Sequence, residues 1–303
     1  MRKDFYGQLD RLYFSQPKSI EAFLQETLTQ CRQEQDSEGI VAVSNELGGF
    51  FRGRARYEDS LLCFQEALKQ MKGLGLTESV PYLTALMNRA GTLRLVGRAE
   101  ESVSDFRRVL ALRKGETGKI PYIRAATLNN LGLAYQDLAR LDQAEDCARQ
   151  ALTILQAMPG MEAEIASSGN NLASLSLRQD RLEDADHWLT EAMAYYQSPA
   201  GEHDPHLANA YTTLASLRFR QGRLEDALAC YTKAAAATEH FFGKNQNYAS
   251  LLYDTALVAH ALGRADATAY LSQAVAIYET LQESADPMRN QAQQLLAEWR
   301  EDL

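Results

Sequence analysis

The chain has 303 residues, of which 46% are hydrophobic and 23% charged, and its formal net charge is −9. This composition is typical of a folded protein, and the acidic balance argues against nucleic-acid binding, which needs a basic surface. No stretch is long and apolar enough to span a membrane, and no apolar run follows Met1. We therefore expect a cytoplasmic protein with no membrane span, no signal peptide and no nucleic-acid partner.

Two short helices are predicted at the start of the chain. One runs near residues 3–14 and the other near 19–33, and Pro17 marks the turn between them. Apolar residues recur at helical spacing in the second segment. Residues 1–34 are therefore predicted to form an irregular helical pair that caps the fold.

A six-residue motif occurs six times in the rest of the chain, at intervals of 41 or 42 residues. Its clearest copy is Gly-Arg-Leu-Glu-Asp-Ala at residues 222–227, and a fixed period of this size is typical of a stacked repeat array. Each copy predicts a turn between two helices, since a small or cap-forming residue is followed by acids that suit a helix N-terminus. Asp180 and Glu183 also have the spacing of a capping box. The copies begin at Ala55, Gly97, Ala139, Asp180, Gly222 and Gly263.

These turns divide the middle of the chain into helix pairs. The pairs are expected near residues 40–75, 82–115, 123–158, 165–198, 207–242 and 248–282. All seven prolines fall in the first turn or between pairs, where they interrupt no helix. We predict six units of about 42 residues over 35–284, then a polar capping helix over 285–303.

Short side chains recur at two positions in every unit. In the first helix they are Gly48, Ala90, Gly132, Ala173, Ala215 and Ala256. Twelve residues later come Ser60, Ser102, Ala144, Ala185, Ala227 and Thr268. Short side chains at a crossing let two helices approach closely, so the two helices of a unit are expected to meet there. Leucine precedes the first small residue in four units, and Arg89 and Thr255 interrupt that column.

This combination resembles the tetratricopeptide repeat family. In the third unit the matching residues are Leu131, Gly132, Tyr135, Ala144 and Ala151. The 42-residue period and the Asn-Asn-Leu runs at 129–131 and 170–172 are similar to the repeats of kinesin light chains and related bacterial regulators. The resemblance covers about residues 40–282 and implies an all-α, right-handed superhelical solenoid of antiparallel helix pairs. It also implies that the first helices line a concave groove.

Polar residues recur along the first helices at fixed positions relative to the small residue. Asparagine and serine are poor helix formers, so a merely hydrated face, which is the alternative reading, would more often carry lysine and glutamate. Asparagine can pair with both groups of a peptide bond, and arginine can bind a carboxylate through two hydrogen bonds. The candidate peptide-binding residues are Asn45, Arg52, Asn88, Arg94, Asn129, Asn130, Gln136, Asn170, Asn171, Ser174, Arg178, Thr212, Ser216 and Arg220.

No constellation of catalytic or metal-binding residues is found in the sequence. The four cysteines lack the close pairing of zinc sites, and three of them, Cys63, Cys147 and Cys230, share one position in the repeat. His203 and His206 have no third ligand in view. We therefore predict no enzyme activity, no cofactor and no metal.

The sequence thus predicts a protein–protein interaction module that binds an extended peptide or a partner-protein segment in the groove. The expected ligand has acidic side chains or a free C-terminal carboxylate, because four arginines share neighbouring positions in the repeat. Asp137 interrupts that line and leaves room for a basic ligand residue. Two alternatives remain open, a peptide-responsive bacterial regulator and a purely architectural scaffold.

Overall fold

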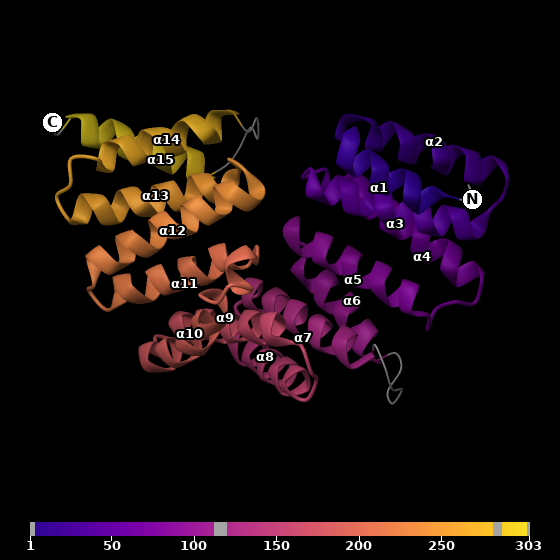
Figure 1. Ribbon diagram of the computed structural model, residues 1–303, viewed down its shortest axis with the longest axis horizontal. Coiled ribbons are helices and arrows are strands. Elements are labelled where there is room, and N and C mark those ends of the chain that lie inside the picture. Colours follow the sequence, from indigo (N-terminus) through magenta and orange to yellow (C-terminus); the bar gives the residue numbers. More distant parts are fainter. Residues whose placement is uncertain (1–3, 112–119, 281–286, 302–303) are drawn as a thin grey trace. The chain divides into compact units, whose positions relative to one another are not determined.

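The computed structural model describes residues 4–111, 120–280 and 287–301, and within these ranges every regular element is a helix (Figure 1). The expectation of an all-α fold built from helix pairs is confirmed. The predicted ends at residues 1–3, 112–115, 281–286 and 302–303 lie outside the described residues.

The chain forms two compact units, Met1–Ile154 and Leu155–Leu303. The helices of the first unit are α1 (Phe5–Ser15), α2 (Ile20–Gln33), α3 (Ser37–Gly53), α4 (Tyr57–Gly73), α5 (Val80–Leu95), α6 (Ala99–Ala111), α7 (Ile120–Asp137) and α8 (Leu141–Gln156), whose last residues reach the second unit. Those of the second unit are α9 (Glu162–Arg178), α10 (Leu182–Tyr196), α11 (Leu207–Arg220), α12 (Leu224–Phe242), α13 (Gln246–Ala261), α14 (Ala267–Thr280) and α15 (Pro287–Glu301). The division into a cap, six repeats and a capping helix stays a prediction.

The small residues lie where the two helices of a repeat cross. A Cβ atom added to Gly48 would lie 2.7 Å from the Phe64 ring, and one added to Gly132 would lie 3.2 Å from the Ala144 carbonyl oxygen. Contacts of this length are not compatible with a larger residue unless the helices move apart. The small side chains therefore set the spacing between the first and second helices.

The sixth repeat departs from the predicted register in its second helix. There the fully buried positions are held by Ala267, Leu271 and Ala274, while Thr268 is only half-buried. The helix begins at Ala267, four residues after Gly263, whereas α12 begins two residues after Gly222. The prediction of Thr268 as the crossing residue was therefore wrong by one position, because a longer turn rotates the helix that follows it.

Each turn motif begins with a residue in the left-handed backbone region. The φ angles are +57° at Ala55, +56° at Ala139 and +59° at Asp180, and the three glycines at this position have φ between +68° and +76°. In the third repeat the Arg140 amide donates to the Tyr135 carbonyl and the Ala139 amide to the Gln136 carbonyl. This pair of bonds ends a helix in the Schellman pattern, and all six turns have it.

The capping box expected at Asp180 is absent, because Asp180 is the left-handed residue and the N-cap of α10 is Arg181. Arg181 instead forms an ion pair with Asp184 in the first turn of α10, at 2.9 Å. Equivalent pairs join Arg98 to Glu101 and Arg223 to Asp226. In these repeats an acid of the motif thus anchors the turn arginine at the helix start, whereas Arg140 in the third repeat pairs with Glu100 of the second.

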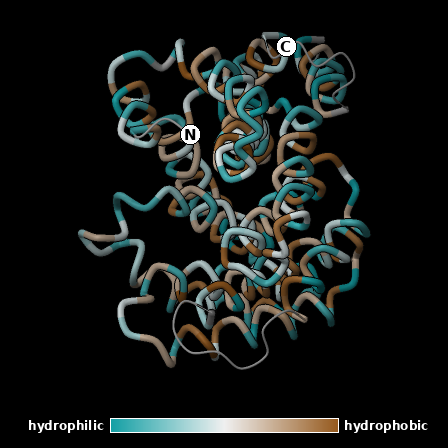
Figure 2. The backbone as a smooth tube through the Cα atoms, turned by 90° about the vertical axis from the view of Figure 1, so that its right-hand side faces the viewer, coloured by the Kyte–Doolittle hydropathy of each residue, from teal (hydrophilic) through white to brown (hydrophobic). Residues whose placement is uncertain are grey.

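Apolar and hydrophilic residues alternate over short distances along the helices (Figure 2). Among the described residues no helix is both long enough and apolar enough to cross a bilayer.

We predict that Ala139→Gly stabilises the protein by about 0.5–1 kcal/mol, because a side chain is strained in the left-handed region and glycine is not. Chemical denaturation followed by circular dichroism measures the change. The matched control is Ala42→Gly inside α3, which is expected to destabilise by about 1 kcal/mol. Destabilisation by both variants would contradict the role given to the left-handed turn residue.

Candidate functional site

The first unit presents seven of the predicted binding residues on its first helices, α3, α5 and α7. Gln136 is buried, and the other six side chains are half-buried. Arg52 on α3 donates from Nη1 to the Asn88 Oδ1 atom on α5, at 3.5 Å. Burial lowers the pKa of Arg52. The first helices of neighbouring repeats are thus joined by the residues predicted to bind a ligand.

Arg94 and Asp137 form an ion pair between α5 and α7, with 3.2 Å between Nη1 and Oδ2. The room predicted for a basic ligand residue at Asp137 is therefore taken by a side chain of the neighbouring repeat. That expectation was wrong because helix periodicity shows a position on one helix and not the side chain that reaches it from the next.

The second unit carries the other seven residues on α9 and α11. Asn170 is buried, Asn171, Ser174, Thr212 and Ser216 are half-buried, and Arg178 and Arg220 are exposed. The Arg220 Nη1 atom donates to the Leu177 carbonyl at 2.5 Å and lies 3.6 Å from the Asp180 carboxylate. Arg220 is therefore a second donor to this carbonyl, which also accepts from the Asp180 amide in the turn that ends α9.

Three of the asparagines are packing residues as well as candidate binding residues. The Oδ1 atoms of Asn45, Asn129 and Asn170 are buried. An atom so covered is not available to a ligand. In the fourth repeat, the half-buried Asn171 is the asparagine that presents accessible surface.

Two carboxylates that were not among the predicted binding residues occupy the same repeat position as three of the predicted asparagines. Asn88, Asn130 and Asn171 lie two residues before the small residue, and the same count gives Glu46 in the first repeat and Asp254 in the sixth. Examining the residue two before the small residue in every repeat would have identified both Glu46 and Asp254 from the sequence. Burial raises the pKa of Glu46, with a smaller contribution from Asp10, and burial raises the pKa of Asp254 to about 6.

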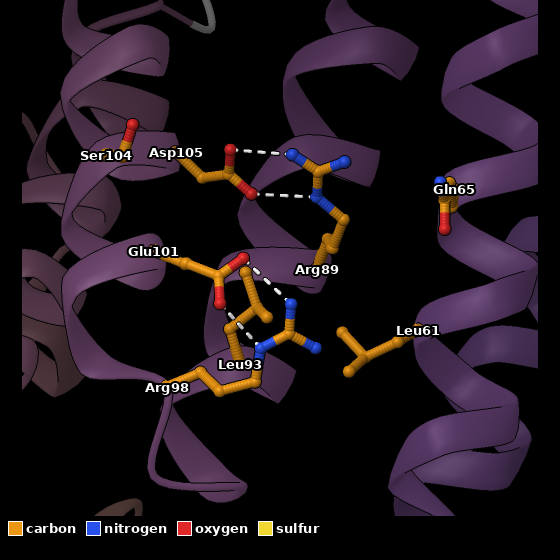
Figure 3. Close-up of a pocket in the computed structure, with 8 residues that line it drawn as sticks. All are labelled: Leu61, Gln65, Arg89, Leu93, Arg98, Glu101, Ser104 and Asp105. Atoms are coloured by element: carbon orange, nitrogen blue, oxygen red, sulfur yellow. Dashed lines mark hydrogen bonds and ion pairs between the residues drawn. The ribbon is translucent and has the colours of Figure 1, made fainter.

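A polar cleft of about 270 Å³ lies between α4, α5 and α6 (Figure 3). Arg89 binds Asp105 through two hydrogen bonds of 2.7 Å, and Arg98 binds Glu101 through two of 2.6 and 2.8 Å. The charges in this cleft thus compensate one another.

The Arg89–Asp105 pair explains the interruption of the leucine column in the second repeat. Arg89 stands where other repeats have leucine, and Asp105 stands at the position of Cys63, Cys147 and Cys230. The leucine and the cysteine that three other repeats carry at these two positions are therefore replaced by an ion pair in the second. Both changes occur together, so neither charge is left without its partner.

Within the described residues no three histidine, cysteine or acidic side chains gather as metal ligands would. The cysteines are free, and burial raises the pKa of Cys63 and of Cys147 to about 11. Thiols with such pKa values are poor nucleophiles near neutral pH.

A family model described as tetratricopeptide repeat matches residues 81–157, 162–239 and 206–280, which together make up more than half of the chain. The chain is 29% identical over 131 residues to Protein KINESIN LIGHT CHAIN-RELATED 2 of Arabidopsis thaliana, a match that covers 43% of this chain and 20% of that protein.

Two solved structures illustrate the likeness of fold. The apo form of RapI has a TM-score of 0.72 at 14% identity, over 92% of this chain and 98% of that one. The apo form of the quorum sensor NprR from B. thuringiensis has a TM-score of 0.63 at 15% identity, over 92% and 84%. At these identities the likeness shows the fold alone.

We predict that Arg89→Leu and Asp105→Cys each destabilise the protein, because each leaves a partly buried charge unpaired. The expected loss is about 2 kcal/mol, below the roughly 3–5 kcal/mol of a fully buried pair, since Arg89 is 26% exposed. The double variant restores the pattern of the other repeats and is expected to return to within about 1 kcal/mol of wild type. Additive losses in the double variant would show that the two residues are not coupled.

A second prediction concerns Asp254→Asn. Because the folded-state pKa of about 6 lies above the ordinary value of 3.8, the folded protein binds the proton more tightly, and stability falls as pH rises from about 4 to 6. The variant is therefore expected to be about 1–2 kcal/mol more stable than wild type at pH 7 and equal to it near pH 4. Denaturation at both pH values measures the difference, with Glu225→Gln as an exposed-carboxylate control. A loss of stability at pH 7 would contradict the burial of an unpaired charge.

Proposed function

Because the chain belongs to the tetratricopeptide repeat family, we propose that it is a non-enzymatic interaction module that binds an extended peptide or a partner-protein segment. The binding surface is the face presented by the first helices of the repeats, called here the first-helix face and defined by the fourteen residues predicted above. The repeats and the fold they share with RapI and NprR point to protein or peptide interaction.

The observation that carries this proposal is the open space beside the polar residues. A Cβ atom added to Gly49 would meet no atom within 4 Å, and one added to Gly91 would meet only the Arg52 guanidinium, at 3.6 Å. Ser174 and Ser216 hold the same position in the fourth and fifth repeats. The small side chains at this position in four repeats leave room for a ligand backbone, whereas the third and sixth repeats carry Leu133 and Leu257 there. The amides beside this position supply donors and acceptors.

The ligand is proposed to carry acidic side chains or a free C-terminal carboxylate. Arg52 supports this chemistry, because its half-buried guanidinium contacts an amide oxygen and forms no ion pair with a described carboxylate. Arg94 and Arg220 support it less, since both already bind groups of a neighbouring repeat. A ligand carboxylate at Arg52 would gain from the low exposure of that site to water.

The proposed compartment is the cytoplasm. All four cysteines are free, as expected of thiols in a reducing environment. The regulator and the architectural scaffold remain alternatives, and a likeness of fold to a quorum sensor does not by itself favour the first of them.

The proposal predicts that removing polar groups from the first-helix face abolishes peptide binding without unfolding the protein. A random peptide array is probed with wild type and with the triple variant Asn171→Ala, Ser174→Ala, Arg178→Ala on α9. Binding to the wild-type hits is expected to fall at least tenfold in this variant, and acidic hits are expected to weaken as salt rises. The matched control replaces His187, Thr190 and Glu191, all exposed on the paired helix α10, with alanine.

Equal binding by the two triple variants would place recognition outside the first-helix face. An array without reproducible hits would favour the architectural scaffold. Hits that are predominantly basic and indifferent to Arg52→Gln would remove the acidic-ligand part of the proposal.

A further inference from the structure

We infer that Asp254 is an anionic subsite of the first-helix face and that it accepts a cationic group of the ligand, either a lysine or arginine side chain or a free N-terminal amine. This inference rests on the proposed function. It concerns only the part of the first-helix face that lies in the second unit.

The position of Asp254 in the repeat places it among the candidate binding residues. It lies on α13, two residues before Ala256, at the position that Asn88, Asn130 and Asn171 hold in earlier repeats. The side chain is half-buried, so it remains accessible to a ligand. Asp254 is thus a charged replacement for a neutral amide on the same face.

The Tyr231 hydroxyl on α12 links this carboxylate to a predicted binding residue. It lies 3.2 Å from the Ser216 hydroxyl on α11, and burial raises the pKa of Tyr231, with a smaller contribution from the charge of Asp254. Burial also raises the pKa of Tyr253, next to Asp254 on α13, and the charge of Asp254 makes a smaller contribution. Since Ser216 is one of the predicted binding residues, Asp254 belongs to the same local surface.

No cation compensates Asp254 within the part of the chain that the structure describes. It takes part in no ion pair or hydrogen bond there, and burial is the sole cause of its raised pKa. Two arginines of the second unit are engaged elsewhere, since Arg220 binds the Leu177 carbonyl at the end of α9 and Arg264 binds Asp266. Lys233 lies over the Tyr211 ring.

A half-buried carboxylate without a partner destabilises the free protein, and a ligand cation placed against it would recover that free energy. The contrast with Asp105 supports this assignment. Asp105, the buried aspartate of the second repeat, pairs with Arg89, whereas no base among the described residues pairs with Asp254. Glu46 holds the same position in the first repeat, but Asp10, Tyr6 and Tyr13 of α1 lie near it. The raised pKa of Glu46 therefore has a cause besides burial, which Asp254 does not share.

Two observations on the chain make the inference testable with a conservative variant. Asn is the residue that three other repeats carry at this position, so Asp254→Asn is expected to keep the fold. Glu225→Gln removes one exposed carboxylate from α12 and serves as the control for the change in net charge.

The experiment uses a positional-scanning hexapeptide library in which each position is fixed in turn as lysine, arginine, glutamine or glutamate. Each peptide is made with a free and with an acetylated N-terminus. Wild type is expected to prefer a cation at one position, or a free N-terminus, by at least tenfold over the neutral equivalent. Asp254→Asn is expected to lose this preference while binding the glutamine peptide as wild type does, and Glu225→Gln to keep it.

Peptide binding without a cation preference, or a preference that survives in Asp254→Asn, would overturn the inference and leave the proposed function standing. Absence of binding to every peptide would overturn both. As a second measurement, the ¹³C shift of the Asp254 carboxyl is followed while the best lysine peptide is added. A bound cation is expected to keep that carboxyl ionised at pH 5.5, and an unchanged shift under saturation would also overturn the inference.

Discussion

At Gly48 the Phe64 ring lies where a side chain would begin, and at Gly132 the backbone of the facing helix is almost as close. This close crossing of two helices is repeated along the chain, and it determines the rest of the architecture. Helices that meet so closely bury small residues at 0% exposure at Ala90, Ala173 and Ala215. The apolar sides of both helices are turned inward by the crossing, so polar residues of the first helix remain on the face away from its partner.

Polar residues on that face have two different tasks. Arg94 and Arg220 hold neighbouring first helices together through Asp137 and the Leu177 carbonyl. Asn171 and Ser174 form no such bond among the described contacts, and both keep accessible surface. A repeat array that contacts mainly its neighbours needs the first kind of residue for stability, and a ligand needs the second.

Charged residues that depart from the repeat pattern can be divided in the same way, into those paired within the protein and those without a described partner. In the second repeat two departures arise together as Arg89 and Asp105, and their charges cancel inside the protein. In the sixth repeat Asp254 departs alone, and its raised pKa is the consequence of burial without a partner. The fold explains a charged substitution whose partner lies in the same repeat. A charged substitution without a partner among the described residues calls for a partner from outside them.

The sequence by itself determined the helical class, the period and most of the small crossing residues, because these depend on a local spacing that recurs in every repeat. It also identified the turn residues, although not that Asp180 adopts a left-handed conformation instead of capping α10. Only the tertiary structure decided which polar side chains are engaged, since Arg94 and Asp137 come from different repeats. It alone showed the shifted register at Ala267 and the unpaired charge of Asp254. Periodicity reports the direction of a side chain on its own helix, whereas partners and burial depend on what the neighbouring helices bring to the same place.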